Sequence, residues 1–97
     1  MSQAKDIVER ASTAGIVIAT AESCTGGMIS AAITDIAGSS RVLDRGFVTY
    51  SNAAKMDMLG VSAETLDTHG AVSEQVAAEM ATGALKHSNA TLTVSVT

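Results

Sequence analysis

The stretch Ile16-Val-Ile-Ala-Thr-Ala-Glu-Ser-Cys-Thr-Gly-Gly27 decides how this chain folds. It opens with an apolar run rich in β-branched residues, Ile16 to Ala19, and closes in a turn of hydroxyl-bearing residues and glycines. Apolar residues then recur at helical spacing, namely Met28, Ile29, Ala32, Ile33 and Ile36. The stretch therefore predicts a strand, a tight turn and a helix, with the first N–H groups of the helix directed at the turn.

The turn itself holds Ser23, Cys24 and Thr25. A nucleophile at this place would have anion-stabilising N–H donors beside it, as acyl transfer requires. Ser and Thr before a helix also serve as N-caps, and a Gly-Gly pair also serves simply as a turn. From these residues alone, both the functional and the structural interpretation stay open.

The composition is that of one globular domain. Apolar residues make up 46% of the 97 residues and charged residues 16%, which excludes a disordered chain. Phe47 and Tyr50 are the two aromatic residues, so the core must be aliphatic. The net charge is −4 and the six basic residues are scattered, so the chain lacks both the positive patch and the stacking platform of nucleic-acid binding. We therefore expect no nucleic-acid partner.

Targeting and metal signals are also missing from the sequence. No apolar stretch approaches the roughly 18 residues that span a bilayer, and the polar N-terminus carries no signal-peptide pattern. A single cysteine cannot form an internal disulfide, and the cysteine and histidine content offers no metal-ligand cluster. We expect a cytoplasmic protein with no membrane partner, no metal and no cofactor.

Two further segments show regular spacing. Residues 4–11 carry apolar side chains three and four apart, which predicts a first helix ending near Gly15. Residues 45–51 alternate in polarity and predict a second strand, with Phe47 and Thr49 on one face.

The remaining segments complete the fold class. Asn52, Ser62 and Ser73 precede helical runs and are predicted N-caps. Residues 92–96 alternate again, so that Leu92 and its apolar neighbours form one face of a third strand. Strands separated by helices predict an α/β fold, a layered sheet of mainly parallel or mixed strands flanked by helices. A sheet of three strands would leave an open edge, so the fold looks truncated after the third strand.

Four ordered blocks of sequence resemble the C-terminal domain of the CinA family, the competence/damage-inducible proteins. They are residues 21–27, 34–40, 45–52 and 69–73. The resemblance covers nearly the whole chain, and four blocks in the same order are a specific match. Because family domains are longer, the resemblance implies that residues 1–97 form the N-terminal portion of a single CinA C-terminal domain. Stand-alone members of the family are nicotinamide-nucleotide amidohydrolases, so the resemblance implies a small-molecule nucleotide substrate whose carboxamide is hydrolysed to the acid and ammonia.

That reaction needs a nucleophile, and Ser23 is the preferred candidate. Cys24 is the alternative, because a thiol is intrinsically the stronger nucleophile. No histidine lies near Cys24 in the sequence to form a thiolate pair, and a lone cysteine beside an apolar strand is commonly a packing residue.

The reaction also needs a base, and Lys55 is the candidate that the resemblance favours. A lysine amine can activate a serine, with Tyr50 as its proton relay or orienting group. The family motif carries tyrosine, asparagine and lysine at Tyr50, Asn52 and Lys55. His69 and His87 both fall at predicted helix ends, where a cation is favourable without any catalytic role.

Several residues are candidates for holding the substrate. Glu22 could orient the base or bind ribose hydroxyls, or simply favour the dipole of the following helix. The N–H groups of Thr25, Gly26 and Gly27 are candidates for the oxyanion or for the substrate phosphate, but not for both. Asn52 belongs to the same expected substrate-binding set.

The sequence leaves alternatives for the phosphate contacts and for the function. Arg41 and Arg45 could contact the phosphate, although surface charges need no such role. A non-catalytic ligand-binding or scaffold domain is the alternative to the enzyme, and release of ammonia would separate the two. The open sheet edge leads us to expect a homo-oligomer or exposed apolar surface.

Overall fold

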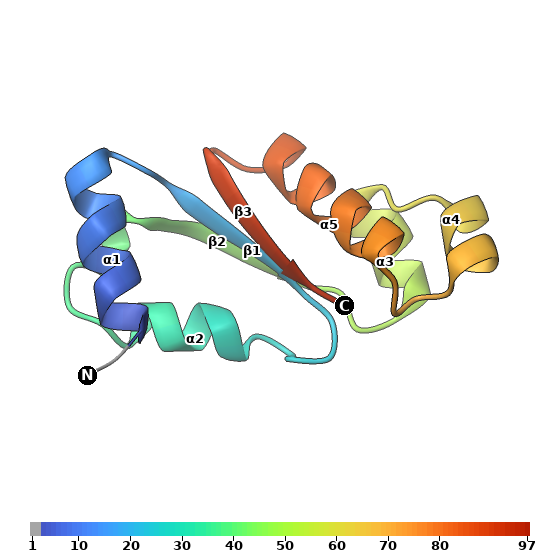
Figure 1. The fold of residues 1–97 in the computed structure, drawn as a ribbon, viewed down its shortest axis with the longest axis horizontal. Helices are drawn as coiled ribbons and strands as arrows, with labels where there is room; N and C mark the ends of the chain where they lie inside the picture. Colours follow the sequence, from blue (N-terminus) through green and yellow to red (C-terminus); the bar gives the residue numbers. More distant parts are fainter. Residues whose placement is uncertain (1–2) are drawn as a thin grey trace.

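The computed structural model describes residues 3–97, which form a three-stranded parallel sheet with helices on both faces (Figure 1). The strands are β1 (Ile18–Glu22), β2 (Leu43–Val48) and β3 (Leu92–Val96), in the order β2-β1-β3. Glu22 pairs with Val48 on one side and with Val96 on the other, so the three strands end together at one edge. The α/β prediction is confirmed, and all the strand pairs in the described part of the chain are parallel.

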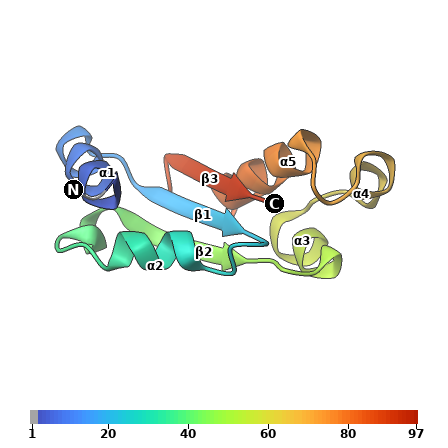
Figure 2. The same cartoon turned by 60° about the horizontal axis from the view of Figure 1, so that its bottom comes forward.

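The helices divide into two groups, one on each face of the sheet. Helices α1 (Gln3–Ala14) and α2 (Met28–Thr34) lie together, with a short 3-10 helix at Ser39–Arg41. Helices α3 (Asn52–Leu59), α4 (Ala63–His69) and α5 (Glu74–Lys86) lie at the other end of the view in Figure 1 and remain grouped in the turned view of Figure 2.

Side-chain alternation along β1 explains this division. Ile18 packs into an aliphatic cluster on the α1 and α2 side, with Val8, Ala11, Ile33 and Val42. Ala21 points to the opposite face and packs into a second cluster, with Leu59, Val61, Leu66, Val76, Met80 and Ala84. Residues one position apart in β1 therefore belong to different layers, and Ser23 continues the face of Ala21.

The first strand differs from its predicted bounds. It begins at Ile18 rather than Ile16 and continues through Glu22. A glutamate normally ends a buried strand, but the Glu22 side chain is completely buried because α2 supplies its hydrogen-bond donors. The helix α2 also ends earlier than the apolar spacing suggested, at Thr34.

The predicted caps are correct in two of three cases. Ser62 and Ser73 are the N-caps of α4 and α5, and each side-chain oxygen accepts a backbone N–H bond three residues on. The prediction that Asn52 caps α3 is wrong, because the Ser51 hydroxyl accepts the bond from Ala54 N at 3.0 Å. Asn52 is instead the first residue inside that helix.

Strand β3 places its hydroxyl face, rather than its apolar face, against α5. The Thr93 hydroxyl donates to the Ala81 carbonyl at 2.8 Å, and the Ser95 hydroxyl donates to the Ala77 carbonyl at 2.7 Å. The apolar face remains partly open to solvent, with Leu92 46% exposed. A groove of about 460 Å³ runs between this face and helices α1 and α2.

Candidate functional site

The candidate site lies at the edge where the strands end. Ser23 follows β1, and its N–H donates to the Val96 carbonyl at 2.8 Å. Thr49 follows β2, and its N–H donates to the Glu22 carbonyl at 2.8 Å. These two bonds continue the parallel pairing beyond the strands, so Ser23 and Thr49 are held side by side. In open α/β sheets this carboxyl edge is where ligands commonly bind.

Ser23 and Lys55 meet at one backbone oxygen. The Ser23 hydroxyl donates to the Tyr50 carbonyl at 3.5 Å, and the Lys55 Nζ donates to the same oxygen at 3.3 Å. Lys55 reaches this point from the first half of α3, which begins directly after the turn that follows β2. Both side chains are buried, with Ser23 8% and Lys55 2% exposed. The structure thus brings together the predicted nucleophile and the predicted base, 32 positions apart in the sequence.

Tyr50 contributes to this arrangement through its backbone. Its side chain is 74% exposed, whereas its carbonyl oxygen joins Ser23 and Lys55. The phenol is therefore available at the surface beside the buried pair.

Glu22 holds the N-terminus of α2. One carboxylate oxygen accepts bonds from the Thr25 hydroxyl at 2.7 Å and from Ile29 N at 2.9 Å, and the other accepts from Ser30 N at 3.0 Å. Burial raises the pKa of Glu22, but the hydrogen bonds from Thr25, Ile29 and Ser30 outweigh burial and lower that pKa overall. The anion at the helix N-terminus is thus an internal carboxylate, which fixes the turn that carries Ser23.

The N–H groups of the turn are not equally available. Gly26 N donates to the Ser23 carbonyl at 3.0 Å. The N–H groups of Thr25 and Gly27 find no acceptor within residues 3–97. Gly27 adopts a left-handed conformation with φ 104°, which favours glycine, and a Cβ there would contact the Val48 side chain at 3.4 Å.

The remaining candidates take no part in the hydrogen bonds that join Ser23 and Lys55 to the Tyr50 carbonyl. Arg45 pairs with Ala19 within β2, and its guanidinium donates to Asp44 Oδ2 at 2.7 Å and to the His87 carbonyl at 3.0 Å. Cys24 is exposed, and its thiol donates to the Thr97 carbonyl at 3.6 Å. His69 is the last residue of α4, and Arg41 and Asn52 are exposed.

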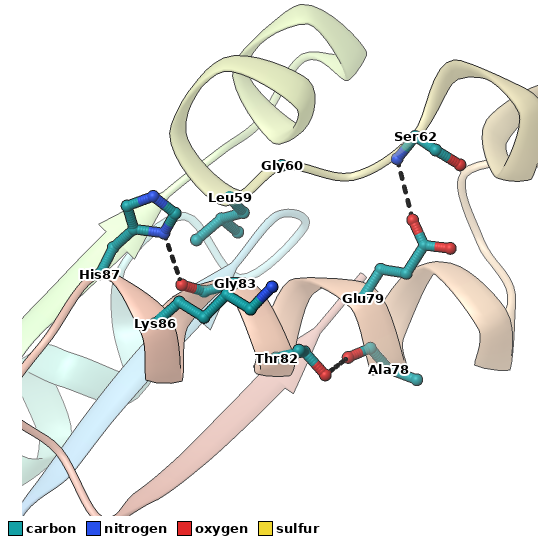
Figure 3. A pocket seen from close by; sticks show the side chains of 9 residues that line it. All are labelled: Leu59, Gly60, Ser62, Ala78, Glu79, Thr82, Gly83, Lys86 and His87. Carbon is teal, nitrogen blue, oxygen red and sulfur yellow. Dashed lines mark hydrogen bonds between the residues drawn. The ribbon is translucent and has the colours of Figure 1, made fainter.

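A second cavity of about 460 Å³ lies between α5 and the segment joining α3 to α4, and its lining includes none of the predicted site residues (Figure 3). Glu79 on its wall accepts a bond from Ser62 N at 2.8 Å and another from the Thr65 hydroxyl at 2.5 Å. The Thr65 bond is the main cause, followed by the Ser62 bond, of the lowered pKa of Glu79. These bonds fasten α4 to α5.

Thr49 was not among the residues predicted to form the site. Its side chain is completely buried, and its hydroxyl is the one buried side-chain polar atom in residues 3–97 without a hydrogen-bond partner. The sequence does carry one signal for this position. Side chains alternate along the predicted strand, and this alternation places Thr49 on the same face as Phe47 and opposite Val48.

Residues 3–97 contain no group of three His, Cys, Asp or Glu side chains placed to hold a metal ion. None of the helices in this range has the length and apolarity to cross a bilayer.

A family model described as the CinA C-terminal domain matches residues 1–97. The chain belongs to the CinA C-terminal domain family. The crystal structure of the competence/damage inducible protein CihA from Agrobacterium tumefaciens superposes on this CinA domain with a TM-score of 0.95 and 58% sequence identity. That comparison covers 97% of this chain and 57% of the Agrobacterium chain.

Some of the sequence relatives carry a functional name, as two of them illustrate. The nicotinamide-nucleotide amidohydrolase PncC of Enterobacter agglomerans is 67% identical to this CinA domain over 76 residues, covering 78% of this chain and 46% of the relative. The protein of the same name from Escherichia coli K12 is 61% identical over 82 residues, covering 84% of this chain and 50% of the relative. The chain thus spans about half the length of the curated relatives it matches.

Proposed function

We propose that this chain carries the nucleophile and the base of an amidohydrolase that acts on the carboxamide of a nicotinamide nucleotide. The observation that carries the proposal is the convergence of Ser23 Oγ and Lys55 Nζ on the Tyr50 carbonyl oxygen. Serine paired with lysine is one of the recurring arrangements that activate a serine for acyl transfer. The names of the relatives supply the substrate class.

The reaction follows from these two groups. Ser23 Oγ attacks the amide carbon and gives its proton to the Lys55 amine. When the C–N bond breaks, Lys55 returns this proton to the leaving nitrogen, which departs as ammonia. Water then cleaves the ester formed on Ser23, with Lys55 again as base, and the carboxylic acid is released.

Donors for the developing oxyanion come from the turn. The unengaged N–H groups of Thr25 and Gly27 are the candidates, because Gly26 N already donates to the Ser23 carbonyl. Glu22 acts as a positioning residue for this turn, since its carboxylate oxygens accept bonds from α2 and Thr25. We assign contacts with the bound nucleotide to the exposed Tyr50 phenol and to Asn52, which is also exposed.

The test is release of ammonia and nicotinate mononucleotide from nicotinamide mononucleotide by the native protein, with Ser23→Ala and Cys24→Ala as matched variants. We expect Ser23→Ala to abolish turnover and Cys24→Ala to retain it. Near-wild-type turnover by Ser23→Ala would overturn the assignment. Binding of the nucleotide without release of ammonia by the native protein would favour a ligand-binding domain instead.

A further inference from the structure

Lys55 Nζ has more hydrogen-bond donors than the structure gives it acceptors. A neutral lysine amine already has two donor hydrogens, whereas Lys55 Nζ has one acceptor within residues 3–97, the Tyr50 carbonyl. The Thr49 hydroxyl is buried nearby in the chain without a partner. A buried nitrogen with spare donor hydrogens and a buried hydroxyl without a partner therefore lie six positions apart in the sequence.

The fold places the two groups on the same side of the sheet. Phe47 packs against the cluster that contains Leu59 of α3. Thr49 lies two residues beyond Phe47 along an extended segment, so its side chain takes the same face. Lys55 belongs to α3 and reaches the carbonyl of Tyr50, the residue that directly follows Thr49.

The proposed reaction makes the mismatch larger. When the Lys55 amine takes the Ser23 proton, Nζ gains one more donor hydrogen and a positive charge in a buried place. Ser23 Oγ is at that moment bonding to the substrate and accepts less well. A second fixed acceptor near the Tyr50 carbonyl would hold the ammonium in position and stabilise it.

We propose that Thr49 is a positioning residue whose hydroxyl accepts a hydrogen bond from the Lys55 ammonium formed during turnover. This inference rests on the proposed function of Ser23 and Lys55. The Thr49 side chain is completely buried, and the role assigned to it is to act through Lys55. A valine would fill nearly the same space, and the difference between the two side chains is the hydroxyl itself.

The test compares Thr49→Val, which removes the hydroxyl, with Thr49→Ser, which keeps it, in the native protein. We expect Thr49→Val to lower kcat about tenfold with KM unchanged, because one hydrogen bond to a charged group is lost. Thr49→Ser should restore kcat to within about threefold of the wild-type value. Thr93→Val is the matched control, because the Thr93 hydroxyl bonds to the Ala81 carbonyl of α5. It should leave kcat unchanged.

Two kinetic outcomes would overturn the inference: wild-type kcat in Thr49→Val, or an equal loss in Thr49→Val and Thr49→Ser. A second readout does not depend on turnover. In a protein labelled with ¹⁵N on lysine and kept in acid, so that the Lys55 side chain carries the ammonium that turnover would form, the Lys55 resonance is identified by its loss in Lys55→Arg. Its ammonium protons should exchange with water faster in Thr49→Val than in Thr49→Ser. If the wild type releases no ammonia, the proposed function fails, and equal exchange rates in the two variants would overturn the role of Thr49 separately.

Discussion

Lys55 Nζ lies 3.3 Å from the carbonyl oxygen of Tyr50, so a buried lysine side chain is held by the backbone of a residue whose own ring is exposed. Lysine side chains are rarely so completely buried without a partner of opposite charge. The carboxyl edge of a parallel sheet, where Lys55 lies, is also where ligands of open α/β sheets commonly bind.

The first prediction concerns the role of Lys55 as a base. Lys55→Arg should lower kcat as strongly as Lys55→Ala, by roughly a hundredfold or more, because a guanidinium stays protonated and cannot accept the Ser23 proton. Ammonia release under saturating nicotinamide mononucleotide measures this. Lys86→Arg, on the exposed end of α5, is the control and should keep the wild-type rate. An active Lys55→Arg enzyme would leave Lys55 as a charge only.

The second prediction concerns Glu22 and pH. The folded state lowers the pKa of Glu22 below its ordinary value of 4.5, so its stabilising effect is present above that value and is lost as the pH falls through the lower folded pKa. Glu22→Gln should therefore reduce the free energy of unfolding by about 2 kcal/mol at neutral pH. The difference from wild type should shrink in acid.

Denaturant unfolding of both proteins at neutral and acidic pH measures this difference. Glu9→Gln, on the exposed face of α1, should change stability by less than about 0.5 kcal/mol. A Glu22→Gln protein as stable as wild type at neutral pH would contradict the capping role.

The third prediction concerns the close approach of α3 and α5 at Gly83. A Cβ on this residue would overlap the Leu59 carbonyl, and Figure 3 shows the two residues facing each other. Gly83→Ala should lower the free energy of unfolding by about 2 kcal/mol. Helix propensity alone would predict that Gly83→Ala raises the free energy of unfolding by about 1 kcal/mol. The sign of the measured change therefore distinguishes steric overlap from helix propensity. Thermal unfolding measures it, with the neighbouring exposed Thr82→Ala as the near-neutral control.

The fourth prediction concerns a polypeptide that consists of residues 1–97 only. Leu92 and Val94 are 46% and 41% exposed beside the open edge of β3. This polypeptide should self-associate or bind a hydrophobic dye, and it should hydrolyse nicotinamide mononucleotide poorly. Sedimentation and dye fluorescence test this, and a Leu92→Thr, Val94→Thr double variant should reduce both signals. A dye-free monomer with full activity would contradict the prediction.

Much of this fold follows from local spacing, and the departures have physical causes. Alternation and helical periodicity identified the three strands and the helices between them. The burial of Glu22 could not be predicted, because it depends on N–H groups that only the folded turn brings to the carboxylate. Which face of β3 packs on α5 could not be predicted either, because the acceptors for the Thr93 and Ser95 hydroxyls are helix carbonyls more than ten residues away.

The candidate site could likewise be predicted only in part. The strand-to-helix turn and the comparison with Cys24 favour Ser23, and the family resemblance favours Lys55, but none of these shows that both side chains reach the Tyr50 carbonyl. Tyr50 was predicted to act through its ring, yet the structure also gives its backbone a part in the arrangement. Thr49 was overlooked because an unpaired hydroxyl is a property of its surroundings and leaves no mark in the sequence.

The Glu22 carboxylate at the start of α2 also affects which end of a nucleotide can approach the turn. Helix N-termini normally attract phosphate, but here the N–H groups of Ile29 and Ser30 are taken by Glu22. Under the proposed function, the substrate phosphate gains no hydrogen bond from these two N–H groups and is repelled by the Glu22 carboxylate behind the turn. The carboxamide end is then the one that approaches Ser23, so the same side chain that shapes the turn also distinguishes the two ends of the substrate.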